Sequence, residues 1–130
     1  MENEIKKRMY LKICYSILDW EWINEPNTFL VFIHLMLLAN RKPHPYKGDI
    51  IKRGEVLASY EYLAGHSGLS IQNVRTAINH LKKSGTITHR KIHKTNVFFI
   101  PSFEKHQESG KPYGNMQTGQ ESSNTAIYND

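Results

Sequence analysis

The segment from Ser67 to Ile87, "SGLSIQNVRTAINHLKKSGTI", limits the possible folds of this chain more than any other. A glycine and a serine at its start predict a tight turn followed by a helix. The apolar residues of the helix repeat with the spacing of one helical face and leave polar residues on the opposite face. That apolar face consists of Val74, Ala77, Ile78 and Leu81.

The residues before this segment predict an apolar helix, a loop and a short strand. The helix runs to about residue 39. Either Asn27 or Thr28 can cap its start, because a short polar side chain accepts from the free N–H groups of a first turn. Residues 41–49 contain two prolines and a glycine and predict a loop. Residues 55–58 predict a short strand.

Two more helices are expected around the tight turn. Ser59 is a suitable cap for a helix from Tyr60 to about His66, and Gly68 suits its end because a residue with positive φ is often needed there. The next helix begins at Ser70 and runs to about Lys83, where a serine and a glycine follow.

The residues after these helices predict a β-hairpin. Residues 86–91 and 96–101 are the expected strands, and residues 92–95 are the expected reversal. Ile87, Val97 and Phe99 are expected to point inward, with Phe98 as a further candidate. The predicted fold is therefore α+β, mainly α: a winged helix-turn-helix with a three-helix core, a short strand and a hairpin wing.

The chain divides into three parts on this interpretation. Residues 1–26 predict an N-terminal extension that packs on the core, with at least one of Trp20 and Trp22 buried. Residues 27–103 form the winged helix-turn-helix domain. Residues 104–130 are rich in Ser, Gly, Asn, Gln and Thr, and this composition predicts a disordered polar tail.

Positive charge is concentrated around the predicted helix-turn-helix. The whole chain has a formal net charge of +5, and residues 59–103 hold six basic residues but a single acidic one, Glu61. A merely solvated surface usually mixes both signs, so this segregation favours a polyanion as partner.

The outer face of the third helix and the hairpin are the candidate double-stranded DNA-binding surface. Asn and Gln pair with adenine in the major groove, Arg and Lys pair with guanine, and Lys and Arg also hold phosphates. A polar solvated helix face is the alternative. The candidate residues are Ser70, Gln72, Asn73, Arg75, Thr76, Asn79, His80 and Lys83 in the helix, and His89, Arg90, Lys91, His93 and Lys94 in the wing.

Other chemistry has little support in the sequence. Cys14 is the only cysteine, which excludes an internal disulfide and suits a cytoplasmic protein. No apolar run approaches the ~20 residues that a membrane span needs. The seven histidines lack cysteine or acidic neighbours in a metal-binding pattern, and no catalytic set is evident. We therefore expect no enzyme activity, no cofactor and no metal.

Several stretches resemble the N-terminal winged-helix domain of phage replisome organiser proteins, which are related to the DnaD-like primosome proteins. The resemblance covers about residues 10–107. The matching stretches are "DWEW" at 19–22, "FIHL" and "LAN" within 32–40, "RGE" at 53–55, "LA" and "GLS" within 63–70, "VRTAI" and "LKKSGTIT" within 74–88, and "VFFIPSFEKHQ" at 97–107.

The resemblance implies origin binding at the start of phage or prophage DNA replication, with helicase-loading proteins as partners. It places Arg75, Thr76 and their neighbours in the recognition position. A transcriptional regulator on the same fold is one alternative, because a fold does not decide the process. A protein-interaction or self-association module of a primosome is another, since the apolar helix and the two tryptophans offer more apolar surface than a small domain must bury.

Overall fold

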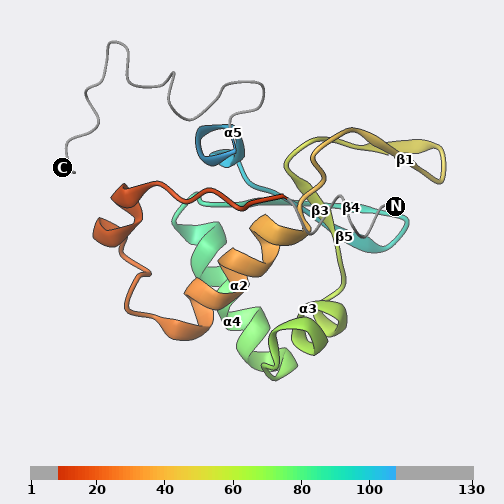
Figure 1. Ribbon diagram of the computed structural model, residues 1–130. Helices are drawn as coiled ribbons and strands as arrows, with labels where there is room; N and C mark the ends of the chain where they lie inside the picture. Colours follow the sequence, from red (N-terminus) through yellow and green to blue (C-terminus); the bar gives the residue numbers. More distant parts are fainter. Residues whose placement is uncertain (1–8, 108–130) are drawn as a thin grey trace, which may run out of the picture.

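The computed structural model describes residues 9–107, which form an α+β fold with three main helices and small antiparallel sheets (Figure 1). The main helices are α2 (Pro26–Leu38), α3 (Tyr60–Ser67) and α4 (Ile71–Lys83). A 3-10 helix, η1 (Tyr15–Asp19), precedes them, and the short α5 (Phe103–His106) follows the sheets. In this part of the chain, no helix is long and apolar enough to cross a membrane.

The helix boundaries around the tight turn agree with the sequence prediction to within a residue. Ser59 caps α3 by accepting from the Tyr62 backbone N–H, and Ser70 caps α4 by accepting from Asn73, both at 3.0 Å. Gly68 ends α3 with a φ of 77°, a left-handed conformation that glycine adopts without steric cost. The turn between the helices is therefore defined by its own residues.

The predicted caps of α2 were wrong. The helix begins at Pro26, whose fixed φ and missing N–H suit the first position of a helix, and Glu25 precedes it without a side-chain cap. Thr28 lies inside the first turn and is buried. The helix ends at Leu38, shortly before the expected stop at Asn40.

The β-hairpin that the sequence predicted as a wing is present, but its turn is tighter than predicted. Strands β4 (Thr88–Ile92) and β5 (Thr95–Phe99) pair with Ile92 opposite Thr95, so only His93 and Lys94 form the reversal. Strand β3 (Glu55–Leu57) pairs with the other edge of β5, giving the sheet order β3-β5-β4. The short strand that the sequence predicted before α3 is thus part of the same sheet.

Residues 41–49, predicted as a loop, contribute instead to a second hairpin. Strands β1 (His44–Tyr46) and β2 (Asp49–Ile51) pair around a two-residue turn, Lys47–Gly48. Ile51 is buried in a small cluster with Ile92 and Val97 from the wing. Contacts with a distant part of the chain therefore stabilise this hairpin, which the local sequence does not predict.

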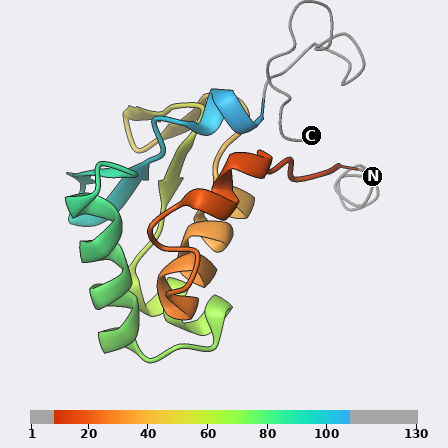
Figure 2. The same ribbon diagram turned by 90° about the vertical axis from the view of Figure 1, so that its left-hand side faces the viewer.

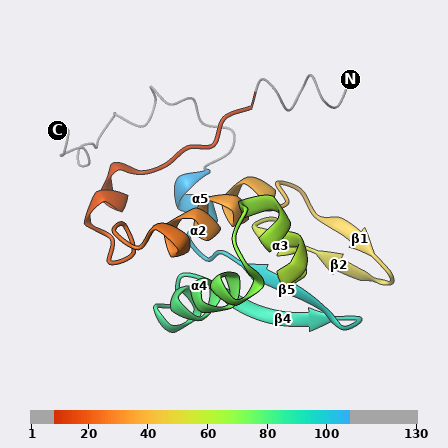
Figure 3. The ribbon, with the colours of Figure 1, turned by 90° about the horizontal axis from the view of Figure 1, so that it is seen from below.

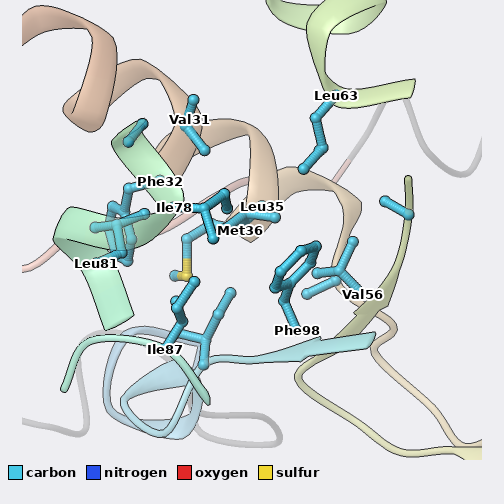
Figure 4. Packing of buried hydrophobic residues seen from close by; sticks show 14 of the residues in the cluster. Val31, Phe32, Leu35, Met36, Val56, Leu63, Ile78, Leu81, Ile87 and Phe98 are labelled. Carbon is cyan, nitrogen blue, oxygen red and sulfur yellow. The ribbon is translucent and has the colours of Figure 1, made fainter. Parts of the chain in front are cut away.

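The main core lies between α2, α4 and one face of the three-stranded sheet. Figure 4 shows Phe98 and Val56 reaching from the sheet towards Leu35 of α2. Phe98 is fully buried, Val97 faces the small cluster on the other side of the sheet, and Phe99 is half-buried. Because side chains alternate across a strand, Phe98 points into the main core, whereas Val97 and Phe99 point to the other side of the sheet. The sequence prediction that Val97 and Phe99 point inward is therefore corrected.

The residues before α2 pack on this core through Trp20 and Trp22. The Trp20 ring lies 4.7 Å from the Phe32 ring, measured between centroids. Trp22 stacks on the His80 ring at 4.5 Å and donates from Nε1 to the Ser84 hydroxyl at 3.0 Å. The N-terminal residues of the described part therefore brace the C-terminal half of α4.

The last described residues also pack on the fold. The predicted disordered tail begins at residue 104, but α5 covers 103–106, and Gln107 is buried. The Gln107 amide hydrogen-bonds to both the N–H and the carbonyl of Lys12. The prediction of a disordered tail is therefore wrong for residues 104–107. Its remaining residues, 108–130, lie outside the described part.

We predict that Trp22→Ala lowers the free energy of unfolding by about 2–4 kcal/mol, because it removes a half-buried indole and the hydrogen bond to Ser84. Urea unfolding followed by circular dichroism measures the loss. Leu18→Ala is the control, since Leu18 is 67% exposed in η1 and should change stability by less than about 0.5 kcal/mol. Equal effects of the two substitutions would contradict this role of Trp22.

Candidate nucleic-acid interface

One face of α4 is open and carries polar side chains of several kinds. Val74, Ala77, Ile78 and Leu81 are buried, which turns the opposite face of the helix outward. No acidic residue occurs between residues 70 and 90. The exposed members of the predicted set are Ser70, Gln72, Asn73, Arg75, Thr76, Asn79 and Lys83.

Arg75 is positioned by an aromatic ring of α3. Its guanidinium lies over the Tyr60 ring, 4.7 Å from the centroid. Stacking of this kind uses the flat face of the guanidinium and leaves its N–H edge for hydrogen bonding. Arg75 is thus an exposed, oriented donor at the junction of α3 and α4.

His80 is half-buried and is held by contacts with two other segments. Its Nδ1 atom lies 2.8 Å from the Thr28 hydroxyl and shares a hydrogen bond with it. Its other contact is the stacked Trp22 ring, nearly parallel at an angle of 7°. With one nitrogen bonded and one ring face covered, His80 connects α4 to α2 and to the N-terminal residues.

Because side chains alternate along β4, the basic residues of this strand lie on both faces of the sheet. His89 lies opposite Phe98, and Lys91 lies opposite Asn96, so both face the same side as the core-facing Phe98. Arg90, between them, points to the other side of the sheet. The five wing residues predicted from the sequence therefore do not form one surface.

Both ring nitrogens and one ring face of His89 make contacts within the fold. Its Nε2 atom donates to the Asn96 side-chain oxygen at 2.8 Å, and its ring stacks on Phe98 with centroids 4.9 Å apart. Its Nδ1 atom lies 3.4 Å from the Lys82 ammonium. Lys82 is exposed and was absent from the predicted set, although its place beside Lys83 was visible in the sequence. The pair connects the end of α4 to the start of the wing.

Arg90 forms an ion pair with a buried carboxylate. Its guanidinium contacts both oxygens of Glu55, with Nε 3.1 Å from Oε2 and Nη2 3.0 Å from Oε1. It also donates to the Ile50 carbonyl at 3.1 Å. Glu55 is 5% exposed, so Arg90 neutralises a buried charge and joins β4 to β3 and β2.

These contacts shift the pKa of Glu55. Burial raises it, but the hydrogen bonds from Arg90 and from the Lys52 N–H, with the nearby positive charges, outweigh burial and hold the pKa below its ordinary value. The hydrogen bonds to Glu55 raise the pKa of Arg90. Both groups are therefore charged at neutral pH.

Lys91, His93 and Lys94 are the exposed members of the wing set. Figures 2 and 3 show α4 and the β4–β5 hairpin along the same edge of the molecule. The open face of α4 and the exposed lysines of the neighbouring hairpin, Lys91 and Lys94, together make up the candidate surface, with amide and hydroxyl groups on the helix and ammonium groups on the hairpin.

Among the described residues, no three His, Cys, Asp or Glu side chains are placed to hold a metal ion. Comparison with known proteins assigns no family: no protein-family model matches the chain, and neither a curated protein nor a solved structure matches it significantly.

We predict that Glu55→Gln lowers the free energy of unfolding by about 1–3 kcal/mol at pH 7, because it leaves Arg90 without its counter-charge. The value lies below that of a fully buried pair because the Arg90 side chain is 39% exposed. Chemical unfolding at a series of pH values measures it. Glu104→Gln is the control, since Glu104 is 63% exposed beside Arg53 and should cost no more than about 1 kcal/mol.

The pH dependence follows from the direction of the Glu55 pKa shift. A carboxyl whose pKa is lower in the folded chain stabilises the fold above the pKa of the unfolded chain and loses this effect as the pH falls through the folded value. The difference between the native protein and Glu55→Gln should therefore shrink as the pH falls below about 4.3, the ordinary glutamate pKa. A difference independent of pH would contradict the ion pair as its cause.

Proposed function

We propose that this chain is a winged helix-turn-helix protein that binds double-stranded DNA. Helix α4 is the recognition helix and enters the major groove, and the β4–β5 hairpin is the wing that contacts the backbone. The observation that supports this most is the open face of α4, which presents amide, hydroxyl and basic groups without a carboxylate, beside exposed wing lysines. Phosphates can approach such a surface without repulsion.

The chemistry of the two elements differs. Gln72, Asn73 and Asn79 can each offer a donor and an acceptor to an adenine edge, and Arg75 can offer two donors to a guanine. Lys91 and Lys94 offer a charge without a fixed geometry, which suits phosphate oxygens. In the proposed complex, α4 reads bases and the wing supplies attraction that is independent of sequence.

The process that we propose is the initiation of phage or prophage DNA replication, in the cytoplasm and without enzymatic activity or a cofactor. The resemblance to replisome organiser proteins supports it, and helicase-loading proteins are the partners it implies. Transcriptional regulation uses the same chemistry on the same fold. The position of the bound site, at a replication origin or in a promoter, separates the two.

A protein-interaction or self-association module is the second candidate, and a groove beside α2 favours it. The groove has a volume of about 460 Å³ and is lined mainly by apolar residues of 9–11 and 36–41. Tyr10 is 78% exposed and Leu37 is 60% exposed there. A tight dimer without salt-dependent affinity for DNA would favour this candidate over DNA binding.

We predict that Asn79→Ala weakens binding to the preferred duplex by about 1–3 kcal/mol and relaxes selectivity at one base pair, because it removes a base contact. Fluorescence anisotropy with a panel of labelled duplexes measures both. Lys105→Ala, an exposed residue of α5, is the control and should leave affinity unchanged. Uniform weakening on all duplexes would contradict base reading by Asn79.

We predict that Lys91→Ala weakens binding to all duplexes alike, because a phosphate contact carries no sequence information. The slope of log affinity against log salt should become shallower by about 1. The same anisotropy assay at several salt concentrations measures it. Loss of selectivity equal to that of Asn79→Ala would contradict the proposed division between helix and wing.

A further inference from the structure

Among the described residues, the non-glycine residues with positive φ lie at the tips of the two hairpins. Within residues 9–107, the non-glycine residues with positive φ are Lys47 at 47°, His93 at 50° and Lys94 at 68°. Lys47 and Gly48 form the β1–β2 turn, and His93 and Lys94 form the β4–β5 turn. Both turns thus have positive φ at both central residues, the pattern of a type I′ turn.

Gly48 suits its position, but Lys47, His93 and Lys94 are not residues that a type I′ turn favours. Asn-Gly is the preferred pair, because asparagine tolerates the left-handed region and glycine adopts it freely. A lysine or histidine there is strained by its Cβ atom, and such strain is typically retained at functional sites. All three strained residues carry a basic side chain, so the chain keeps basic groups where others would make a more stable turn.

The two tips are joined into one structure. His93 donates from Nε2 to the Lys47 carbonyl at 2.8 Å, and its ring lies edge-on to Tyr46 with centroids 6.2 Å apart. Behind the tips, Ile51 packs with Ile92 and Val97. Figure 3 shows the two hairpins extending side by side beyond the helices. Their basic groups are therefore held together on a common support.

The lysines at the tips are not neutralised within the described part of the chain. No ion pair to another described residue involves Lys47 or Lys94. The Lys47 ammonium lies 5.4 Å from the Tyr46 ring centroid, a contact that keeps its charge. Asp49 is the nearby acid, and one of its oxygens accepts from the Ile50 N–H at 2.9 Å. The tips therefore present ammonium groups that form no ion pair with another described residue.

We propose that the joined tips extend the wing's contact with the phosphate backbone of double-stranded DNA to the β1–β2 hairpin, where Lys47 adds a phosphate contact beside that of Lys94 of β4–β5. This inference rests on the proposed function and extends it to a hairpin that the sequence predicted as a loop. Strand β4 begins beside α4 and extends from it to the tip of its hairpin (Figure 3). His93 does not face the DNA in this arrangement; it is the positioning residue that holds Lys47 beside Lys94.

The test separates charge from strain by improving the turns while removing the lysines. Lys47→Asn creates an Asn-Gly turn, and Lys94→Gly places glycine at the second left-handed position. Each should leave the melting temperature unchanged or raise it, because each relieves a strained φ. Each should also weaken binding to a random-sequence duplex and make its salt slope shallower by about 0.9, the effect of one lost phosphate contact. Lys105→Ala is the control for loss of a surface lysine.

The outcomes distinguish this inference from the proposed function. If Lys47→Asn and Lys94→Gly keep the native salt slope while Lys91→Ala and Asn79→Ala weaken binding, the tip contact is wrong and DNA binding stands. If the native protein shows no salt-dependent affinity for duplex DNA, both proposals fail. A lower melting temperature in both turn variants would overturn the argument from strain, and with it the assignment of the tips as a functional site.

Discussion

The burial of one face of α4 is the constraint on which the rest of the structure depends. Val74, Ile78 and Leu81 are fully buried against α2 and the sheet. Because successive residues of an α-helix turn by about 100°, sealing this face fixes the direction of every other side chain on the helix. The outward position of Asn79 and its neighbours is thus a consequence of the hydrophobic core.

Polar contacts at the edge of the core hold α4 at both ends. The Ser70 cap fixes its start, and Trp22, through His80 and Ser84, fixes its end. Lys82 and His89 then connect the helix to the wing. In the proposed complex α4 needs such support, since a displacement of about 1 Å at its base contacts would lose most of their hydrogen-bond energy.

The sequence predicts those helices whose ends are determined by capping residues next to them. Ser59, Gly68 and Ser70 act on their own neighbours, so the extents of α3 and α4 could be read directly. Strands β1 and β2 could not, because each has three residues, β1 contains Pro45, and their stability comes from packing of Ile51 on the distant wing. Local patterns carry no information about such a partner.

The candidate site was predictable in part for the same reason. Helical spacing identified the open face of α4 but could not separate side chains that face outward from those that another segment engages. Thr28 binds His80 from 52 residues away, and Glu55 binds Arg90 from 35 residues away. Residue type alone therefore could not separate His80 and Arg90, which support the fold, from basic residues that are exposed. The exposed basic residues of the wing set include Lys91 and Lys94. The structure separates amides on a rigid helix from ammonium groups on strands, so in the proposed complex selectivity and salt-dependent affinity reside on different elements and can be altered independently.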